Sequence, residues 1–444
     1  MKNTARKHFT KVWLASAISL MISNQVMAES QLTQLIEQAL SSDASREQIY
    51  AQSQALRSTG IASSTLADPT LKVGFGGLPV DSFKFDEDPM TNISVGLMQK
   101  FGRGSSLDLQ QKQTGQQADV LAMQVQVREL EVANAITQLW IELGFLQKAE
   151  AILHENRQLL SEMETYIKTN YSIGKSESQD LLQAQLQLGR LDEKLQTNRQ
   201  LQGRIYAQLT EWLPNLSEQK PQGIKALEWS TLNKLLNSKA NQDTEFYDLL
   251  KSNPTIKMSE LAITATKTKV DIADESYSPQ FGVEVMYAYR QANGMGGQPA
   301  SDLVSAYVTM DLPLFTDKRQ DQNYAAAQYQ VGAAKSQRDV LLRQMNAKVN
   351  SLLVDKNNLE QRLSRYNHTL LPQAKDRTQA VERGYENNTA QFNDVISAAS
   401  DELSIELEKQ RLFSDLDKTY SNLAFYLNGF DYHVSAPQLS PSEQ

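Results

Sequence analysis

The sequence predicts a mainly α-helical protein with a small β part, built from two related halves. One short pattern occurs twice at a constant offset, and a long run of helical periodicity leads into each copy. Each half also contains a pair of strictly alternating segments, which supplies the β part. A length of 444 residues ordinarily suggests about two or three domains, whereas the repeat indicates two homologous halves of one architecture.

The repeated pattern is typical of a tight reversal between two helices. An aromatic residue is followed three positions later by Gly or Asn, and six positions further on by Asp. Gly and Asn tolerate a positive φ and commonly end helices. Ser176, Ser178 and Thr389 are good N-cap residues for the helix that restarts. The pattern residues of the two copies are Tyr171, Gly174, Asp180, Tyr385, Asn388 and Asp394.

Very long helices lead into both turns. Apolar residues recur at spacings of three and four between Val132 and Leu153, which is one seam of a helix. The stretch from Ser105 to about Asn170 contains no proline, and a single helix there would be ~100 Å long. The second approach, residues 318–383, is interrupted only by Pro372. The sequence therefore predicts two long helical hairpins.

Two strand pairs are predicted at residues 70–100 and 280–314, in matching places of the two halves. Their strict alternation indicates one apolar face and one polar or small face, and each strand could span a bilayer within a barrel at ~9–11 residues. Four strands cannot close a barrel, and an open edge in lipid costs several kcal/mol for each unpaired group. Two copies of the chain would give eight strands and three copies 12 strands; the alternative is a water-soluble sheet lying on the helices.

Residues 1–28 are typical of a secretory signal peptide. Positive charge between Lys2 and Lys11 precedes a short apolar stretch, and a small-residue cleavage site ends at Ala28. A transmembrane anchor is the alternative, but the apolar stretch is too short for one. We expect an exported chain that begins at Glu29.

Composition excludes several classes of function. The chain has no cysteine, which excludes disulfides, thiol catalysis, Cys-ligated metals and a lipid-bearing N-terminal Cys. The net charge of −8 without a basic patch argues against a nucleic-acid partner. His154, His368 and His433 are too widely spaced to suggest a metal site, and no nucleophile–base pair is evident. We therefore expect no cofactor, no metal site and no enzymatic activity.

The predicted organisation follows from aligning the halves. Leu40–Asp43 aligns with Leu250–Asn253, and the strand pairs and turns follow in the same order. The predicted segments are the signal peptide 1–28, a first repeat 29–213, a linker 214–248, a second repeat 249–427 and a C-terminal tail 428–444, which we expect to be frayed.

The signal peptide, the two-fold repeat, the two strand pairs and the paired turns together resemble the TolC family of outer-membrane efflux ducts. The resemblance covers about residues 30–430. It implies a homotrimer whose strands form a 12-stranded barrel in outer-membrane lipid, continued by a periplasmic α-helical tunnel. It also implies an equatorial belt formed by residues 214–248 and the tail. Partners would be a periplasmic adaptor at the helical tip and an inner-membrane pump of the RND type.

The same resemblance places both turns at a periplasmic aperture, with Tyr171 and Asp180 in the first turn and Tyr385 and Asp394 in the second. It implies a gate in which Tyr385 acts with Asp180, and a ring of Asp394 carboxylates inside the constriction. Two positions depart from the family pattern, because Ser397 replaces a second acid of the ring and Ala390 replaces an arginine.

Simpler interpretations exist for the aperture residues. An aspartate near a helix start is favoured by the helix dipole by roughly 0.3–1 kcal/mol, and the tyrosines could merely pack the turns. Residues 85–91 and 139–141 are similar to the heavy-metal and copper efflux branch, which would make metal cations the cargo. The alternatives to a duct are a periplasmic structural coiled coil and the adaptor itself, which lacks two matched strand pairs.

Overall fold

The computed structural model describes residues 31–174, 176–214, 227–237, 245–387 and 389–437. The predicted signal peptide and most of the predicted linker lie outside these ranges. The chain divides into two compact units: Met1–Glu47 with Gln126–Pro254 and Leu342–Gln444, and Gln48–Val125 with Thr255–Leu341. Among the described residues, no helix combines the length and the apolar character that a membrane crossing requires.

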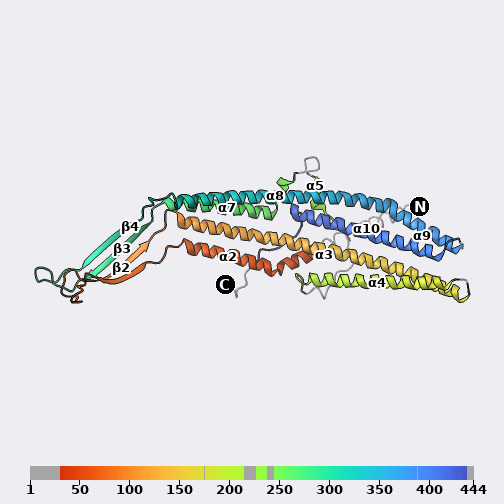
Figure 1. Cartoon of the computed structure of the whole chain (residues 1–444), viewed down its shortest axis with the longest axis horizontal. Helices are drawn as coiled ribbons and strands as arrows, with labels where there is room; N and C mark the ends of the chain where they lie inside the picture. The colour runs from red at the N-terminus through yellow and green to blue at the C-terminus, as the bar shows by residue number, and fades with distance from the viewer. Residues whose placement is uncertain (1–30, 175, 215–226, 238–244, 388, 438–444) are drawn as a thin grey trace, which may run out of the picture. The chain divides into compact units, whose positions relative to one another are not determined.

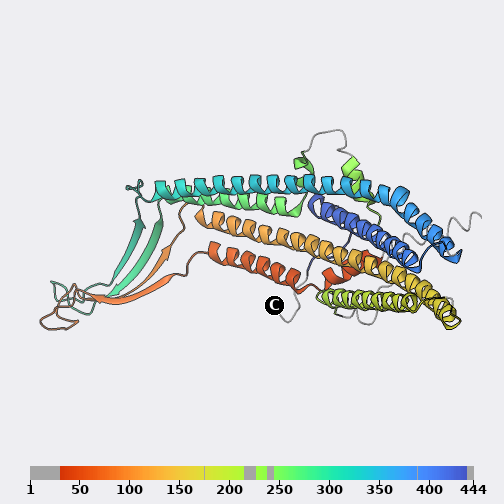
Figure 2. The same cartoon turned by 45° about the vertical axis from the view of Figure 1, so that its right-hand side comes forward.

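The second unit contains one four-stranded antiparallel sheet in the order β1-β2-β3-β4. The strands are β1 (Thr70–Gly76), β2 (Asn92–Lys100), β3 (Phe281–Tyr289) and β4 (Leu303–Met310). Each half supplies one hairpin, and β2 pairs with β3 to join the hairpins (Figures 1 and 2). Both predicted strand pairs are therefore confirmed.

The register of the sheet gathers most of the apolar side chains of the four strands on one face. Residues that lie opposite each other on paired strands share a face, and the alternation stays in phase from β1 to β4. We call this the apolar face: Leu71, Val73, Phe75, Ile93, Val95, Leu97, Phe281, Val283, Val285, Tyr287, Tyr289, Val304, Ala306, Val308 and Met310. The opposite face, which we call the polar face, carries the charged residues and mainly small or polar ones besides. Its charged residues are Lys72, Glu284 and Lys100, and its larger uncharged side chains are Asn92, Met98, Met286, Leu303 and Tyr307.

The loop of the first hairpin is held by a close backbone approach at Gly77. Its φ is 65°, and a Cβ there would lie 2.7 Å from the carbonyl oxygen of Met90. The Thr91 hydroxyl donates to the Gly77 carbonyl at 2.7 Å and fastens the same point. Arg290 of the second hairpin donates to the carbonyl oxygen of Pro89 at 3.3 Å, so the two loops contact each other.

Helix α3 (Ser106–Ser172) has 67 residues and confirms the predicted long helix. Helix α4 (Ser178–Leu209) returns from it. Its Asn198 side chain donates to the Leu146 carbonyl at 3.1 Å, and its Asp192 accepts from Arg157 at 2.5 Å, so polar contacts join the two antiparallel helices.

The second hairpin contains the break that Pro372 predicts. Helix α8 (Gln320–Arg365) passes through a π-turn (Tyr366–Leu370) into α9 (Leu371–Glu386), and α10 (Phe392–Leu427) returns. Proline has no N–H, and its ring clashes with the carbonyl four residues earlier in a regular helix. The wider turn, in which the Leu371 N–H donates to the Tyr366 carbonyl, keeps the chain helical up to the proline.

Shorter helices complete the structure. Residues 31–41 are helical and are followed by α2 (Ala44–Ser64). Helix α5 (Ser230–Asn237) falls in the predicted linker, and helix α6 (Tyr247–Leu250) crosses the predicted boundary between the linker and the second repeat. Helix α7 (Pro254–Asp274) continues into a 3-10 turn (Glu275–Tyr277) and so to β3. The main core of the first unit comprises Leu32, Ile36, Leu40, Val132, Ile136, Trp140, Leu143, Leu146, Ile205, Leu209 and Leu213, among others.

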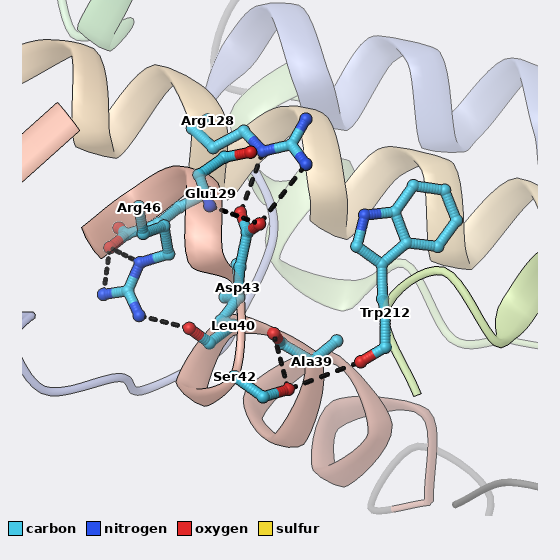
Figure 3. Close-up of polar contacts among 9 residues, drawn as sticks. Ala39, Leu40, Ser42, Asp43, Arg46, Arg128, Glu129 and Trp212 are labelled. Carbon is cyan, nitrogen blue, oxygen red and sulfur yellow. Dashed lines mark hydrogen bonds and ion pairs between the residues drawn. The ribbon is translucent and has the colours of Figure 1, made fainter. Parts of the chain in front are cut away.

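A buried ion cluster fixes the start of α2 (Figure 3). The Arg46 guanidinium is 3% exposed and donates to Glu129 at 2.6 Å and to the Leu40 carbonyl. Asp43 accepts from Arg128 at 2.8 Å and from the Ser45 N–H at 3.1 Å, which caps α2. Buried charges are tolerated when they are paired and hydrogen-bonded in this way.

The expectation of a frayed tail is wrong for residues 429–435. Phe430, Tyr432 and Val434 pack against the main core, because the chain needs apolar cover over this end of the helices. The Ser435 carbonyl accepts from Arg46 at 2.9 Å, and the His433 N–H donates to the Glu37 carboxylate at 2.8 Å. Helix α10 ends at Leu427, and the C-cap residue Asn428, with a φ of 53°, turns the chain toward these contacts.

Candidate functional site at the two helical turns

The first turn reverses the chain within a few residues after α3. Gly174 has a φ of 74°, and its N–H donates to the Tyr171 carbonyl at 3.0 Å. This left-handed conformation is available to glycine at little cost, which explains the residue type at this position of the repeat. The Tyr171 side chain is 47% exposed.

The second turn is organised around Gly384, one residue before the pattern begins. The Gly384 carbonyl accepts from the Thr389 N–H at 2.7 Å and from the Thr389 hydroxyl at 3.0 Å. A Cβ on Gly384 would lie 3.0 Å from the Ala390 Cβ, so the returning chain passes directly against it. Asn388 lies outside the described residues. The glycine that directly precedes Tyr385 in the sequence could have predicted this close approach of the returning chain.

Asp180 and Asp394 occupy the same position, the third residue of the helix that restarts. Helix α10 begins with a capping box in which Gln391 and Asp394 bond each other's backbone, the Gln391 N–H donating to Asp394 at 3.1 Å. The N-cap residues are Glu177 and Gln391. The prediction of Ser or Thr caps is therefore wrong, because the aspartate at the third position already accepts the N-cap N–H.

Tyr385 belongs to an apolar cluster that joins the two hairpins. Its ring lies 5.9 Å from the ring of Phe392, which is 2% exposed. The cluster contains residues from α3, α4 and α10 and fastens the two turns to each other. Its buried members are Leu153, Leu160, Ile167, Ala184, Leu191, Leu195, Phe392, Ile396 and Leu403.

The structure brings Tyr385 of the second turn to Ser176 and Asp180 of the first. Burial and the Asp180 charge raise the pKa of the Tyr385 hydroxyl, while a hydrogen bond with Ser176 acts in the opposite direction. Burial first and the Glu177 charge second raise the pKa of Asp180. A tyrosine and an aspartate from the two copies of the repeat thus share one partly dehydrated location. Asp394 is exposed, and its carboxylate accepts the Gln391 N–H of the capping box.

A groove of about 380 Å³ opens beside Tyr385. Its apolar lining includes Leu159, Met163 and Tyr166, and acidic residues from both hairpins surround it. Among them is Glu382, whose pKa is raised by burial first and then by its acidic neighbours Glu402 and Glu386. The tips of the two hairpins therefore combine apolar surface with concentrated negative charge.

This architecture is similar to that of known proteins. Residues 246–429, which include β3, β4 and the second turn, match the family model described as outer membrane efflux protein. The chain has the fold of the outer-membrane efflux proteins. The predicted resemblance to the TolC family is thereby confirmed, and this family and fold are those of channels, not enzymes.

Solved structures with the outer-membrane efflux fold match nearly the whole chain. The channel protein CusC is 13% identical over 90% of this chain and 92% of its own, with a TM-score of 0.72. The outer-membrane channel OprN is 16% identical, covers 90% of each chain and has a TM-score of 0.72. VceC from Vibrio cholerae is 15% identical over 90% of this chain and 95% of its own, with a TM-score of 0.69. At these identities the likeness is one of fold. No curated protein sequence matches the chain.

Proposed function

We propose that this protein is an outer-membrane export duct, in which three copies of the chain form a 12-stranded barrel continued by a periplasmic helical tunnel. It conducts substrates passively from an inner-membrane RND-type pump, to which a periplasmic adaptor connects it. The observation that supports this most strongly is the sheet, whose apolar face extends over all four strands and is interrupted only at Gln99 of β2 within the described sheet.

The apolar face is far too exposed for a sheet in water. Val73, Val304 and Val308 are 71%, 74% and 75% exposed, and the other large apolar residues of this face are between 40% and 64% exposed. Contiguous apolar surface of this size marks contact with a protein or a membrane. Its alternation with small and polar residues matches strands of a membrane barrel, which face lipid on one side and water on the other.

The edges of the sheet support an assembly of several chains. The strand order leaves β1 and β4 each paired on one side only within the described sheet. In lipid, unpaired backbone groups cost several kcal/mol each, so β4 of one copy must pair with β1 of the next until the barrel closes. Three copies give 12 strands, the number that the family resemblance implies.

The two turns would then form the periplasmic aperture. Tyr385 and Asp180 lie together in one chain, which supports a gate built from both turns. The proposal retains Asp394 as a carboxylate ring around the symmetry axis, which attracts cations. Resemblance of residues 85–91 and 139–141 to the heavy-metal branch supports metal cations as cargo.

Lipid contact is tested by charging the apolar face. The variant Val283→Asp with Val285→Asp places acids at mid-strand, at a cost below the ~2–4 kcal/mol known for Arg or Lys at mid-bilayer. We expect loss of the heat-modifiable trimer from the outer-membrane fraction. The matched control, Ser94→Asp with Ser305→Asp, puts the same charges on the polar face and should assemble. Normal assembly of the first variant would contradict the barrel, and it would favour a periplasmic structural or adaptor protein.

The Asp394 ring is tested separately in single-channel recordings. Asp394→Ala should weaken block by a trivalent cation while leaving the trimer intact. An unchanged block with a lower melting temperature would leave Asp394 as a capping residue only, as its bond to Gln391 alone would suggest.

A further inference from the structure

The polar face of the sheet carries one ion pair that crosses an entire strand. Lys72 on β1 donates to Glu284 on β3 at 2.6 Å, although β2 lies between these strands. The Lys72 side chain is 46% exposed and the Glu284 side chain 14% exposed. The carboxylate is thus held against the sheet, whereas the ammonium group stays accessible to water.

The sequence of β2 makes this crossing feasible. Lys72 lies opposite Gly96, and Glu284 lies opposite Met98, on the same face. Gly96 offers no side chain for the lysine stem to pass over. A Cβ there would lie 3.0 Å from the Val285 carbonyl oxygen and 3.1 Å from the Met286 Cβ, so a larger residue would require β3 to move slightly away.

Lys72 and Glu284 are the two charged residues that lie within the described strands, away from the strand ends. In the four strands of the described sheet, the other charged residue is Lys100, the last residue of β2. The Lys72 and Glu284 charges cancel when paired. Loss of either partner would leave a charge of one sign on the polar face, repeated in every copy of the chain.

We propose that the Lys72–Glu284 pair keeps the barrel lumen free of charge selectivity at this level. This inference rests on the proposed duct, in which the polar face lines the passage. Rings of like charge select ions of the opposite sign in membrane pores. With both partners present, three pairs leave this level of the lumen without net charge, and the exit passes solutes of either sign. Charge selection, where the duct has any, therefore acts at another level.

The absence of cysteine in the chain makes a direct test available. A single reporter, Met286→Cys, lies on the polar face of β3, opposite Gly96 and two residues from Glu284, at ~7 Å along the strand. The trimer is reconstituted in lipid vesicles, and the reporter reacts with a cationic and an anionic methanethiosulfonate of similar size. The measured quantity is the ratio of the two reaction rates.

We expect opposite changes from the two partners. Lys72→Met should raise the cation-to-anion ratio about fivefold, because an unpaired carboxylate at ~9 Å changes the rate for each sign of reagent about twofold in water. Glu284→Gln should lower the ratio by a similar factor. The control Lys100→Met removes an equal charge from the same face. Lys100 lies opposite Gly282, four residues or ~13 Å along the sheet from the reporter and beyond a Debye length, and its loss should change the ratio less than about twofold.

The exchanged pair, Lys72→Glu with Glu284→Lys, keeps the opposite charges together and should return the ratio of the parent. If a single variant does not assemble into a trimer, the ratio measured for the exchanged pair still tests the inference. Ratios unchanged in both single variants, a shift in the same direction in both, or a ratio altered fivefold by the exchange would overturn the inference. If the proposed duct itself is wrong, a different result is expected. A reporter Val95→Cys, on the apolar face, would then react with the water-soluble reagents, whereas Met286→Cys on the polar face would not.

Discussion

Replacing Asp417 by asparagine should stabilise the protein at neutral pH. Asp417 lies on α10, and its carboxylate accepts from the Trp229 indole N–H at 3.3 Å. The Trp229 ring stacks on Tyr420, with the ring centres 6.0 Å apart, and meets Phe430 edge-on at 6.5 Å. This arrangement holds the segment before α5 against α10 and the tail, but it surrounds the carboxylate with aromatic rings.

Burial raises the pKa of Asp417 from 3.8 to about 6, more than the Trp229 hydrogen bond and the Lys148 charge lower it. The folded protein therefore binds the proton more tightly than the unfolded chain does. Stability from this group is fully present below pH 3.8 and is lost as the pH rises through about 6. A shift of about two units corresponds to roughly 3 kcal/mol at pH 7.5, which is an upper limit because the side chain keeps some contact with water.

Asparagine keeps an oxygen to accept the Trp229 N–H and carries no charge. We expect Asp417→Asn to raise the free energy of unfolding by roughly 2–3 kcal/mol at pH 7.5, and by almost nothing at pH 4. Thermal and urea unfolding of the detergent-solubilised trimer, followed by circular dichroism from pH 4 to 8, measures this. The matched control Asp415→Asn, two residues away, loses a partly exposed ion pair with Arg411 and should be destabilised by less than about 1 kcal/mol. An Asp417→Asn variant no more stable than the parent at pH 7.5, or equally favoured at both pH values, would refute the reasoning.

Three further changes test the turns and the buried ion cluster. Tyr385→Phe removes the hydroxyl near Asp180 and should raise the resting conductance in single-channel recordings; conductance equal to that of the parent would remove the hydroxyl from the gate. Gly384→Ala forces a methyl group against the returning chain and should cost about 1–3 kcal/mol of unfolding free energy, whereas Gly189→Ala, with open space around it, should cost nothing. Arg46→Met leaves Glu129 buried without its partner and should cost about 3–5 kcal/mol in urea unfolding, against less than about 1 for Arg57→Met in an exposed pair; equal costs would contradict the burial argument.

The long elements could be predicted from sequence because their periodicity is uninterrupted. Helix α3 lacks proline and keeps one apolar seam, so local pattern and packing agree over its whole length. The strands alternate without a slip, and a period of two fixes which residues share a face once the register is known. Pro372 marked a break in the second long helix, although its form as a π-turn depends on how the surrounding turns adjust.

The remaining features depend on contacts between distant segments. The N-caps Glu177 and Gln391 are poor by residue type, and they are accepted because an aspartate three residues later bonds back. The tail contains Pro and Ser, yet Phe430 and Tyr432 find an apolar surface that only the folded helices create. The Lys72–Glu284 pair requires the β2–β3 pairing, which joins the two halves and has no signature within either strand.

The orientation of the chain in the outer membrane tests the central claim most directly. The chain offers no native cysteine, so single cysteines at Gly294, in the loop between β3 and β4, and at Asn387, at the second turn, can be labelled on intact cells with a membrane-impermeant maleimide. An outer-membrane duct predicts labelling at Gly294 from outside, and labelling at Asn387 only after the outer membrane is permeabilised. Labelling at Asn387 on intact cells, with Gly294 protected, would contradict the account.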